Sequence, residues 1–419
     1  MTIVRLVEKR IIPQRQEIYS AVDAVSFAAK NLYNLVNYHI RQAYIHDHRY
    51  LKMAELWKMI KPTAAYQALP RKVSNQVIWH VYHDWGSYYE AVKVWRIAPE
   101  KFKARPRIPK YKPKLDGRTI VTYEKGAINH KNYPKNGVVS PSGLDLPVPV
   151  GEGVQQLRIV PKKGHYVLEV VYELHVPENP NLDKSLVAGM DIGVNNLAAL
   201  TSNKIGFQPR LVNGRPLKAV NQYYNKKKAV LQSNLARIDC KKKPPKPDDK
   251  RGKRFLSHEI VRMGVQRERR IENYLHTASS RIIKLLVKEK IGVLVIGHNK
   301  DWKQETNLGD KGNQNFVSIP FNKFIHQLTY KAQLNGMEVI QTEESYTSKC
   351  SFLDEEELCH QRDYAGKRVK RGLFRASDGR KINADINGSY NIIRKVFPNA
   401  FRCNGTVGAC AVHPAGFIL

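Results

Sequence analysis

The chain has 419 residues, with 70 Lys and Arg against 37 Asp and Glu and a formal net charge of +33. This charge exceeds what solubility requires and is typical of proteins that bind a polyanion, so nucleic acid is the leading candidate partner. No apolar run approaches the ~20 residues that cross a bilayer, which argues against a membrane protein. The five cysteines are scattered and odd in number, which predicts no disulfide framework and favours a cytoplasmic location.

The N-terminal region is predicted to be a strand followed by helices. Residues 2–12 alternate between apolar and polar side chains, as in a strand, and lack the apolar core of a signal peptide. Helical spacing follows over about 14–46 and again over about 69–95. The first helix has a polar stripe made of Asn34, Asn37, Tyr38 and Arg41. This stripe is either a solvated face or a surface that contacts nucleic acid.

Residues 101–114, KFKARPRIPKYKPK, form a basic segment that cannot be a regular helix. It contains seven Lys or Arg, three Pro and no acid, and proline fixes φ and removes a hydrogen-bond donor. We expect a stiff, extended strap that lies along a phosphate backbone, in preference to a disordered linker.

Short strands dominate the region after this strap. Segments such as RTIVTYEKG and HYVLEVVYEL, between 118 and 174, are separated by Gly, Pro and Asn. With the opening strand they predict a small antiparallel β-barrel interrupted by the helices. The stretch 176–184 marks the end of this half.

The second half has the element order of an RNase H-like sheet. A buried strand runs into Asp191, and a long, very basic helical region follows over 218–290. A strand at 291–296, a helix at about 320–335, the strand MEVIQT and a closing helix complete the order. Early strands, later parallel strands with helices between them and a final helix predict a mixed α/β sheet.

Two aspartates lie where such a sheet could carry chemistry. Asp191 ends the first strand, and Asp385 lies near the start of the closing helix. A lone Asp at a strand end is more often a turn or cap residue, but two in this order inside a basic protein favour a nuclease site. Phosphodiester hydrolysis with two Mg²⁺ ions requires several carboxylates, because Mg²⁺ prefers hard oxygen ligands.

Three motifs follow one another in this half: GMDIGVNNLA around Asp191, YTSKC at 346–350 and NADINGSYNIIRK around Asp385. Their residues and order resemble the TnpB proteins, transposon-encoded relatives of the type V CRISPR effectors. The helix NLYNLVNYHIRQAY and the basic strap also look like the N-terminal half of that family. The resemblance therefore covers nearly the whole chain.

The resemblance implies an RNA-guided DNA endonuclease. Such a protein would bind a guide RNA, recognise a short motif beside a double-stranded DNA target, and cut with a RuvC-like site that uses Mg²⁺ or Mn²⁺. Asp191 would be the carboxylate of the first RuvC motif and Asp385 that of the third. The sequence leaves the oligomeric state open.

The implied fold is α/β and β multi-domain, with an N-terminal antiparallel β-barrel, a helical insertion and a RuvC-like (RNase H-like) domain. The expected domains are a barrel at 1–13 plus 106–183, a helical recognition insertion at 14–105, the RuvC-like nuclease domain at 184–345 and 384–419, and an insertion at 346–383 at the position of a zinc ribbon.

The chain departs from the family pattern at the second RuvC motif. That motif usually ends in Glu, whereas the matching strand GVLVIG ends in Gly297. One interpretation is a nuclease-inactive, RNA-guided DNA-binding repressor. The other is a nuclease whose third carboxylate comes from a neighbouring strand. A strand transferase or junction resolvase that uses no RNA is a third hypothesis.

Strand 337–342 should lie parallel to 291–296, so the acids that follow it, Glu343 and Glu344, could reach the same metal. Side chains alternate along a strand, so at most one of the two points inward. We favour Glu344 as the third carboxylate, ahead of Asp301 and Glu305.

The cysteines depart from the family pattern as well. Family members commonly carry two C-x-x-C pairs before the last Asp, whereas Cys350 is followed here by Cys359 and His360 without that spacing. Four tetrahedral ligands cannot be assembled locally, so we expect no structural zinc. The segment KRVKRGLFRASDGRKIN is predicted to be a basic hairpin near the cleft.

Within the resemblance, the N-terminal half reads the target-adjacent motif. Lys72 and Gln76 lie one helical turn apart and could enter one groove, where Gln pairs with adenine and Lys reaches guanine. The other candidate nucleic-acid-binding residues are Asn34, Tyr38, Thr122, Arg105, Arg107, Lys110, Arg267 and Arg270.

Overall fold

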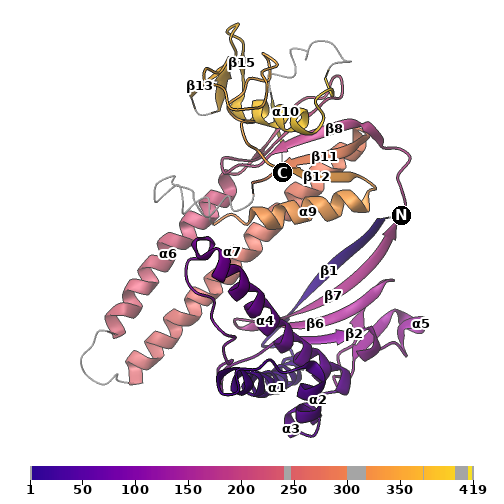
Figure 1. Cartoon of the computed structure of the whole chain (residues 1–419), viewed down its shortest axis with the longest axis vertical. Helices are drawn as coiled ribbons and strands as arrows, with labels where there is room; N and C mark the ends of the chain where they lie inside the picture. Colours follow the sequence, from indigo (N-terminus) through magenta and orange to yellow (C-terminus); the bar gives the residue numbers. More distant parts are fainter. Residues whose placement is uncertain (1, 240–246, 300–317, 371, 402–413, 418–419) are drawn as a thin grey trace. The chain divides into compact units, whose positions relative to one another are not determined.

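The structure is a computed structural model that describes residues 2–239, 247–299, 318–370, 372–401 and 414–417 (Figure 1). The chain divides into two compact units, which we call the N-terminal unit (Arg5–Leu174) and the C-terminal unit (Met1–Val4 with His175–Leu419). None of the helices in the described ranges is both long and apolar enough to cross a membrane.

The N-terminal unit is built on a four-stranded sheet covered by helices. The strand order is β1 (Thr2–Pro13), β7 (His165–Val176), β6 (Val154–Lys162) and β2 (Val121–Glu124). A separate small sheet contains β3 (Ile128–Asn129), β4 (Val138–Pro141) and β5 (Val148–Pro149). The helices are α1 (Ile18–Ile45), α2 (Met53–Ile60), α3 (Ala64–Gln67), α4 (Arg71–Ile97) and the short α5 (Tyr133–Asn136).

The predicted β-barrel is wrong for the part of the chain that the structure describes. The four-stranded sheet is open, and α1 and α4 pack on it. Leu157 and Tyr123 of the sheet share one core with Val36 of α1 and Val81 of α4. Because a sheet needs to bury one apolar face, a helical cover removes the reason for this sheet to close on itself.

The C-terminal unit is built on a six-stranded mixed sheet. Its strand order is β12 (Glu338–Thr342), β11 (Ile291–Gly297), β8 (Asp183–Asp191), β9 (Asn196–Ser202), β10 (Arg210–Asn213) and β16 (Ala415–Phe417). Strands β8, β9 and β10 are successively antiparallel, and β11 is parallel to both β8 and β12. The carboxyl ends of β8, β11 and β12 therefore meet at one sheet edge.

Helices cover both faces of this sheet. The long helix α7 (Pro247–Lys288), which pairs with α6 (Arg215–Asp239), and α9 (Phe321–Leu334) pack against one face, and α10 (Ala384–Val396) packs on β8, β9 and β11. Ala188, Met190, Leu294 and Ile296 belong to the core with α7 and α9, whereas Val187, Val293 and Val295 pack with Ile392 and Ile393 of α10.

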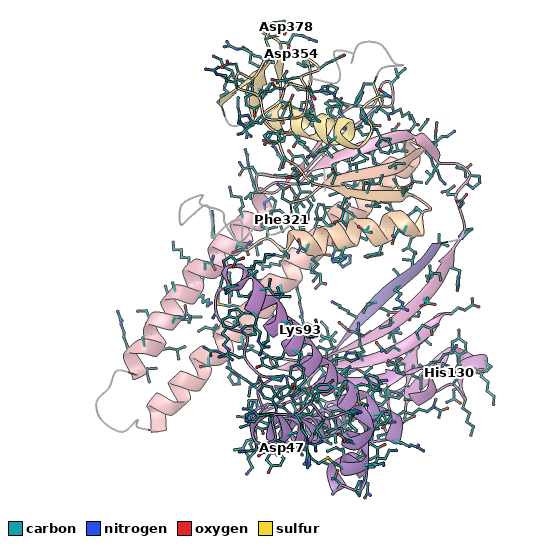
Figure 2. The ribbon with its side chains drawn as sticks, viewed as in Figure 1. Asp47, Lys93, His130, Phe321, Asp354 and Asp378 are labelled. Carbon is teal, nitrogen blue, oxygen red and sulfur yellow. The ribbon has the colours of Figure 1, made fainter. Side chains whose placement is uncertain are left out.

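A small insert lies between β12 and α10. It contains the three-stranded antiparallel sheet β13 (Lys367–Lys370), β14 (Leu373–Arg375) and β15 (Lys381–Ile382). Figure 2 shows Asp354 and Asp378 in this part of the chain. Asp354 accepts hydrogen bonds from the hydroxyl (2.6 Å) and backbone N–H (3.0 Å) of Ser377, which ties the loop before the sheet to the turn within it.

Candidate active site

Strand alternation decides which face of the sheet the first acid occupies. Met190 packs towards α7 and α9, so Asp191, the next residue, points to the α10 face. Gly297 follows Val295 at the same alternate spacing on β11 and lies on the α10 face as well. The ends of β8 and β11 therefore open towards the start of α10.

The start of α10 places the second acid beside the first. The side chain of Asn383 accepts hydrogen bonds from the backbone N–H groups of Asp385 (3.0 Å) and Ile386 (3.2 Å), which caps the helix. A Cβ atom at Gly388, about one turn on, would lie 3.0 Å from Oδ2 of Asp191. Glycine at this position therefore lets α10 approach the end of β8 closely.

Asp385 is held from two sides. Asn196 Nδ2 donates to Asp385 Oδ2 at 2.7 Å, from the first residue of β9. Arg368 Nη2, from β13 in the small insert, lies 3.5 Å from Asp385 Oδ1. These two contacts fix the carboxylate before any ligand binds to it.

Glu344 occupies the space beside Gly297. A Cβ atom at Gly297 would lie 2.5 Å from Oε1 and 2.8 Å from Cγ of Glu344, and 2.5 Å from Cδ1 of Ile392. Thr342 is the register partner of Gly297 on β12, so Glu344 is two residues on and shares its face. The side chain that crosses over β11 thus needs a glycine beneath it.

Burial and like charges dominate the electrostatics of the site. Burial, followed by the negative charges of Glu344 and Asp385, raises the pKa of Asp191, while Arg368 opposes this shift. Burial raises the pKa of Glu344 to about 7, against the lowering effect of Lys395. Oε1 of Glu344 is buried without a hydrogen-bond partner in the described residues. Such a group favours a cationic ligand.

The other acids considered for the third position differ from Glu344. Glu343 is 62% exposed and pairs with Lys395 at 3.4 Å, and it also accepts a hydrogen bond from Ser345. It therefore points away from Asp191. Asp301 and Glu305 lie outside the described residues.

The donor set is compatible with Mg²⁺ or Mn²⁺. Asp191, Glu344 and Asp385 offer only carboxylate oxygens, the ligands that hard divalent cations take, and one of these oxygens is buried and unpaired. Within the described ranges, no three His, Cys, Asp or Glu side chains are already grouped so that they could hold one ion. Two ions about 4 Å apart distribute such ligands between them.

The two cysteines singled out from the sequence lie near each other in the insert. Sγ of Cys350 is 3.3 Å from the carbonyl oxygen of Glu357 and 3.8 Å from that of Cys359. Cys350 is buried, and its backbone carbonyl accepts hydrogen bonds from Asn387 (2.9 Å) and Asn391 (2.8 Å) of α10. These contacts attach the loop that follows Glu344 to the helix that carries Asp385.

The candidates for motif recognition lie on α4 and β2. Lys72 Nζ donates to the carbonyl of Gly126 at 2.7 Å, so its charge is engaged within the unit. Gln76 is partly buried. Thr122 is 2% exposed, and its hydroxyl has no hydrogen-bond partner among the residues that the structure describes. Thr122 lines a polar pocket of 410 Å³ together with His80, His83, Arg158 and others.

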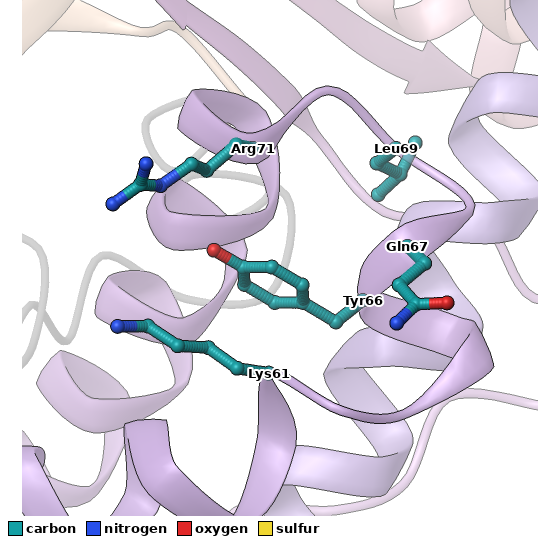
Figure 3. A pocket seen from close by; sticks show the side chains of 5 residues that line it. All are labelled: Lys61, Tyr66, Gln67, Leu69 and Arg71. Atoms are coloured by element: carbon teal, nitrogen blue, oxygen red, sulfur yellow. The ribbon is translucent and has the colours of Figure 1, made fainter.

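A second pocket of the N-terminal unit, of 340 Å³, is lined by Lys61, Tyr66, Gln67, Leu69 and Arg71 (Figure 3). The cationic groups of Lys61 and Arg71 lie on either side of the Tyr66 ring in this view. The Tyr66 hydroxyl donates to Asn75 at 2.9 Å, which fixes the ring.

The structure places the remaining candidates in different surroundings. Asn34 hydrogen-bonds the backbone of Lys112, and Arg105 stacks on Trp95, whereas Tyr38 is 48% exposed. Arg107, Lys110 and Arg270 are exposed side chains. Arg267 donates to Asn221 (2.6 Å) and to the carbonyl of Ser318 (3.1 Å), so it joins α7 to α6 and to the segment before α9.

Sequence reasoning missed the residues that position the acids. Neither Asn196 nor Arg368 belongs to the helix that carries Asp385, so no local sequence pattern predicts their contacts with it. The one available signal was the polar pair NN in GVNNLA, directly before a buried strand. The basic hairpin predicted at 367–383 is present as β13–β15, and its Arg368 reaches Asp385.

Comparison with known proteins identifies the class. A probable transposase family model (OrfB_IS605) matches residues 169–303, and a Cas12f1-like TNB domain model matches residues 321–392. The fold matches a Cas12f1 solved as a complex with single-guide RNA and target DNA, with a TM-score of 0.52 at 15% identity over 90% of this chain and 82% of that one. The fold is therefore a multi-domain α/β architecture of the kind found in Cas12 effectors.

Two relatives narrow the identification. The TnpB-like protein ORF457 of Acidianus two-tailed virus is 26% identical over 59% of this chain and 49% of its own length. The CRISPR-associated endodeoxyribonuclease Cas12f2 of a Micrarchaeota archaeon is 24% identical over 57% of this chain and 41% of its own. The chain thus spans about half the length of these curated relatives. The family models and these relatives are of the TnpB and Cas12f type.

Proposed function

We propose that this protein is an RNA-guided DNA endonuclease that binds a guide RNA, recognises a short motif beside a double-stranded DNA target, and cuts with a RuvC-like site. The names of its relatives, a TnpB-like protein and a Cas12f2 endodeoxyribonuclease, support this reaction class. We assign the nuclease domain to 184–345 and 384–419, the insert at 346–383 to the target cleft, and the sheet and helices before 184 to guide and motif binding.

The observation that carries the proposal is the position of Glu344. Its side chain fills the space over Gly297, where the family's usual carboxylate would begin, and its charge acts on Asp191. In this proposal the third carboxylate comes from the segment directly after β12 instead of the end of β11, which keeps the acidic character of the site. Asp191, Glu344 and Asp385 are the proposed catalytic residues.

These three residues would hold Mg²⁺ or Mn²⁺. The chemistry that these ions would supply is activation of a water and stabilisation of the charge that develops on the phosphate. Asn196 keeps the Asp385 carboxylate in position, and Arg368 lies beside the same carboxylate.

Cleavage by the purified protein with its co-expressed RNA tests the proposal. We expect a DNA target with the correct adjacent motif to be cut, and Asp191→Ala and Glu344→Ala to abolish cutting while guided binding persists. Each variant should lose more than the ~10–100-fold that removal of an outer-shell partner costs. Glu343→Ala, the matched control one residue away, should cut normally. Tight guided binding without cutting in either Mg²⁺ or Mn²⁺ would refute the nuclease.

A second candidate is a nuclease-inactive, RNA-guided DNA-binding repressor. The glycine in place of the usual Glu at the end of β11 favours it. In that case repression of a promoter that contains the target would be unaffected by Asp191→Ala, and wild-type protein would leave the DNA intact.

A further inference from the structure

The basic strap is docked on α1 by hydrogen bonds to its backbone. Four α1 side chains at helical spacing donate to strap carbonyl groups: Lys30 to Lys114 (2.7 Å), Asn34 to Lys112 (3.0 Å), and Asn37 (3.3 Å) and Arg41 (2.8 Å) to Pro109. Asn34 also accepts from the N–H of Lys112 at 2.8 Å. Asn34, Asn37 and Arg41 of the polar stripe are thus engaged by the strap, whereas Tyr38 is 48% exposed.

The two segments match in length. From residue 30 to 41 a helix rises ~16 Å at about 1.5 Å per residue, and from 114 back to 109 an extended chain covers ~16 Å at about 3.1 Å per residue. The strap therefore runs antiparallel to α1 in an extended conformation. Its three prolines stiffen that conformation in the unbound protein.

The docking is built into the interior of the unit. Lys30 is 1% exposed, and its ammonium group contacts the Lys114 carbonyl and the ring of Phe27 at 3.8 Å. Burying a cation is costly unless its hydrogen bonds are satisfied. The Lys114 carbonyl that accepts from Lys30 is therefore part of the folded structure. If the strap moved away, the buried ammonium group of Lys30 would lose this hydrogen-bond partner.

Because the strap is docked through its backbone, some of its basic side chains can point outward. Lys112 and Tyr111 turn back onto the helix, with Lys112 Nζ over the Tyr33 ring and Tyr111 under Arg41. Arg107 and Lys110 are exposed, and within the described ranges neither is paired with a carboxylate. Neighbouring cations two or three residues apart lie ~6–9 Å apart, about two to three phosphates of a strand with one charge per ~3.4 Å.

We propose that the strap 101–114 presents a preformed ridge that binds the phosphodiester backbone of a nucleic acid, with Asn34 and Arg41 as positioning residues that hold its docked part, 109–114, extended. The identity of the polyanion rests on the proposed function. Preforming the ridge lowers the conformational entropy lost on binding. Arg107 and Lys110 would supply the ionic contacts, and Asn34 would act only through the strap.

Salt-dependent binding separates these two roles. The full-length protein is titrated with a single-stranded RNA of mixed sequence and with duplex DNA of the same sequence, at several salt concentrations. For Arg107→Gln/Lys110→Gln we expect the slope of log K against log salt to fall by about 0.7 per contact on the RNA or about 0.9 on the duplex. The matched control is Lys162→Gln/Lys163→Gln, two exposed cations of the β6–β7 turn, which should keep the slope. The probe, RNA or duplex DNA, for which the slope decreases more is the nucleic acid that the ridge binds.

Asn34→Ala should weaken binding several-fold at every salt concentration without changing the slope, because all cations remain. Trypsin should then cleave after Arg107 and Lys110 faster than in the wild type, while cleavage at other sites keeps its wild-type rate. A wild-type slope in Arg107→Gln/Lys110→Gln, or an unchanged affinity in Asn34→Ala with the strap opened, would overturn the inference. Failure of the wild type to bind either probe would instead overturn the proposed function.

Discussion

Glycine 297 is the residue on which the site depends most. Any larger side chain at this position meets Glu344 and Ile392 at 2.5 Å. Overpacking of this kind costs about 1–3 kcal/mol. We therefore expect Gly297→Ala to lower the melting temperature and to displace Glu344, with loss of cutting.

Gly264→Ala is the matched control in the same unit, since a Cβ there meets only the Tyr224 hydroxyl at 3.7 Å. It lies within α7, where Ala is favoured over Gly by roughly 0.5–1 kcal/mol. Thermal unfolding of both variants should show opposite shifts. A Gly297→Ala protein as stable and active as the wild type would contradict the packing described for Glu344.

Asn196 is the residue whose role is least visible in the sequence. Its amide holds Oδ2 of Asp385 at 2.7 Å. We expect Asn196→Ala to weaken Mn²⁺ binding by ~10–100-fold, the usual cost of removing an outer-shell partner. Titration of Mn²⁺ followed by electron paramagnetic resonance measures this without turnover. Asn181→Ala, an exposed asparagine of the same unit, should bind Mn²⁺ as the wild type does.

At the scale of elements, Asp23 connects α1 to two distant segments. It accepts from Arg118 at 2.6 and 2.8 Å and from the Tyr166 hydroxyl of β7 at 2.7 Å. The hydrogen bonds from Arg118 hold the pKa of Asp23 below its model-peptide value of 3.8. A carboxyl group whose pKa is lower in the folded than in the unfolded protein adds stability at pH values above its unfolded-state pKa. This contribution is lost as the pH falls through the folded-state pKa.

In Asp23→Asn, the free energy of unfolding of the N-terminal unit should therefore depend less on pH in the acid range than it does in the wild type. We expect it to cost about 1.5–3 kcal/mol at neutral pH, the value of hydrogen bonds to charged groups, and progressively less below pH 4. Urea unfolding at a series of pH values, followed by tryptophan fluorescence, measures the difference. An equal loss at all pH values would show that the carboxylate charge plays no part.

The elements also show how much the sequence predicts. The helices now seen as α1 and α4 followed from periodicity, because one-sided burial imposes a period. Strand alternation allowed at most one of Glu343 and Glu344 to point inward and did not choose between them. The predicted closed barrel was wrong, because an open sheet covered by α1 and α4 has the same alternation of apolar and polar residues. Contacts such as Asn34 with Lys112 or Asn196 with Asp385 join residues far apart, which no local pattern encodes.

At the scale of the whole molecule, the net charge of +33 predicts steep salt dependence. Between 50 and 200 mM salt, a protein with 6–10 phosphate contacts loses roughly 10³–10⁵ in affinity. We expect the guide RNA to dissociate over this range when it is measured by filter binding at several salt concentrations. An affinity that is independent of salt would show that phosphate contacts do not dominate.

In the proposed site one carboxylate comes from directly after β12 instead of the end of β11, and the site keeps its charge. The most direct measurement is guided DNA cutting by the exchange variant Gly297→Glu/Glu344→Ala, compared with Glu344→Ala alone. Removing Glu344 clears two of the three closest contacts of a side chain at 297, so we predict that the exchange restores cutting that the single variant has lost. Full activity of Glu344→Ala, with no further gain from the exchange, would contradict the claim.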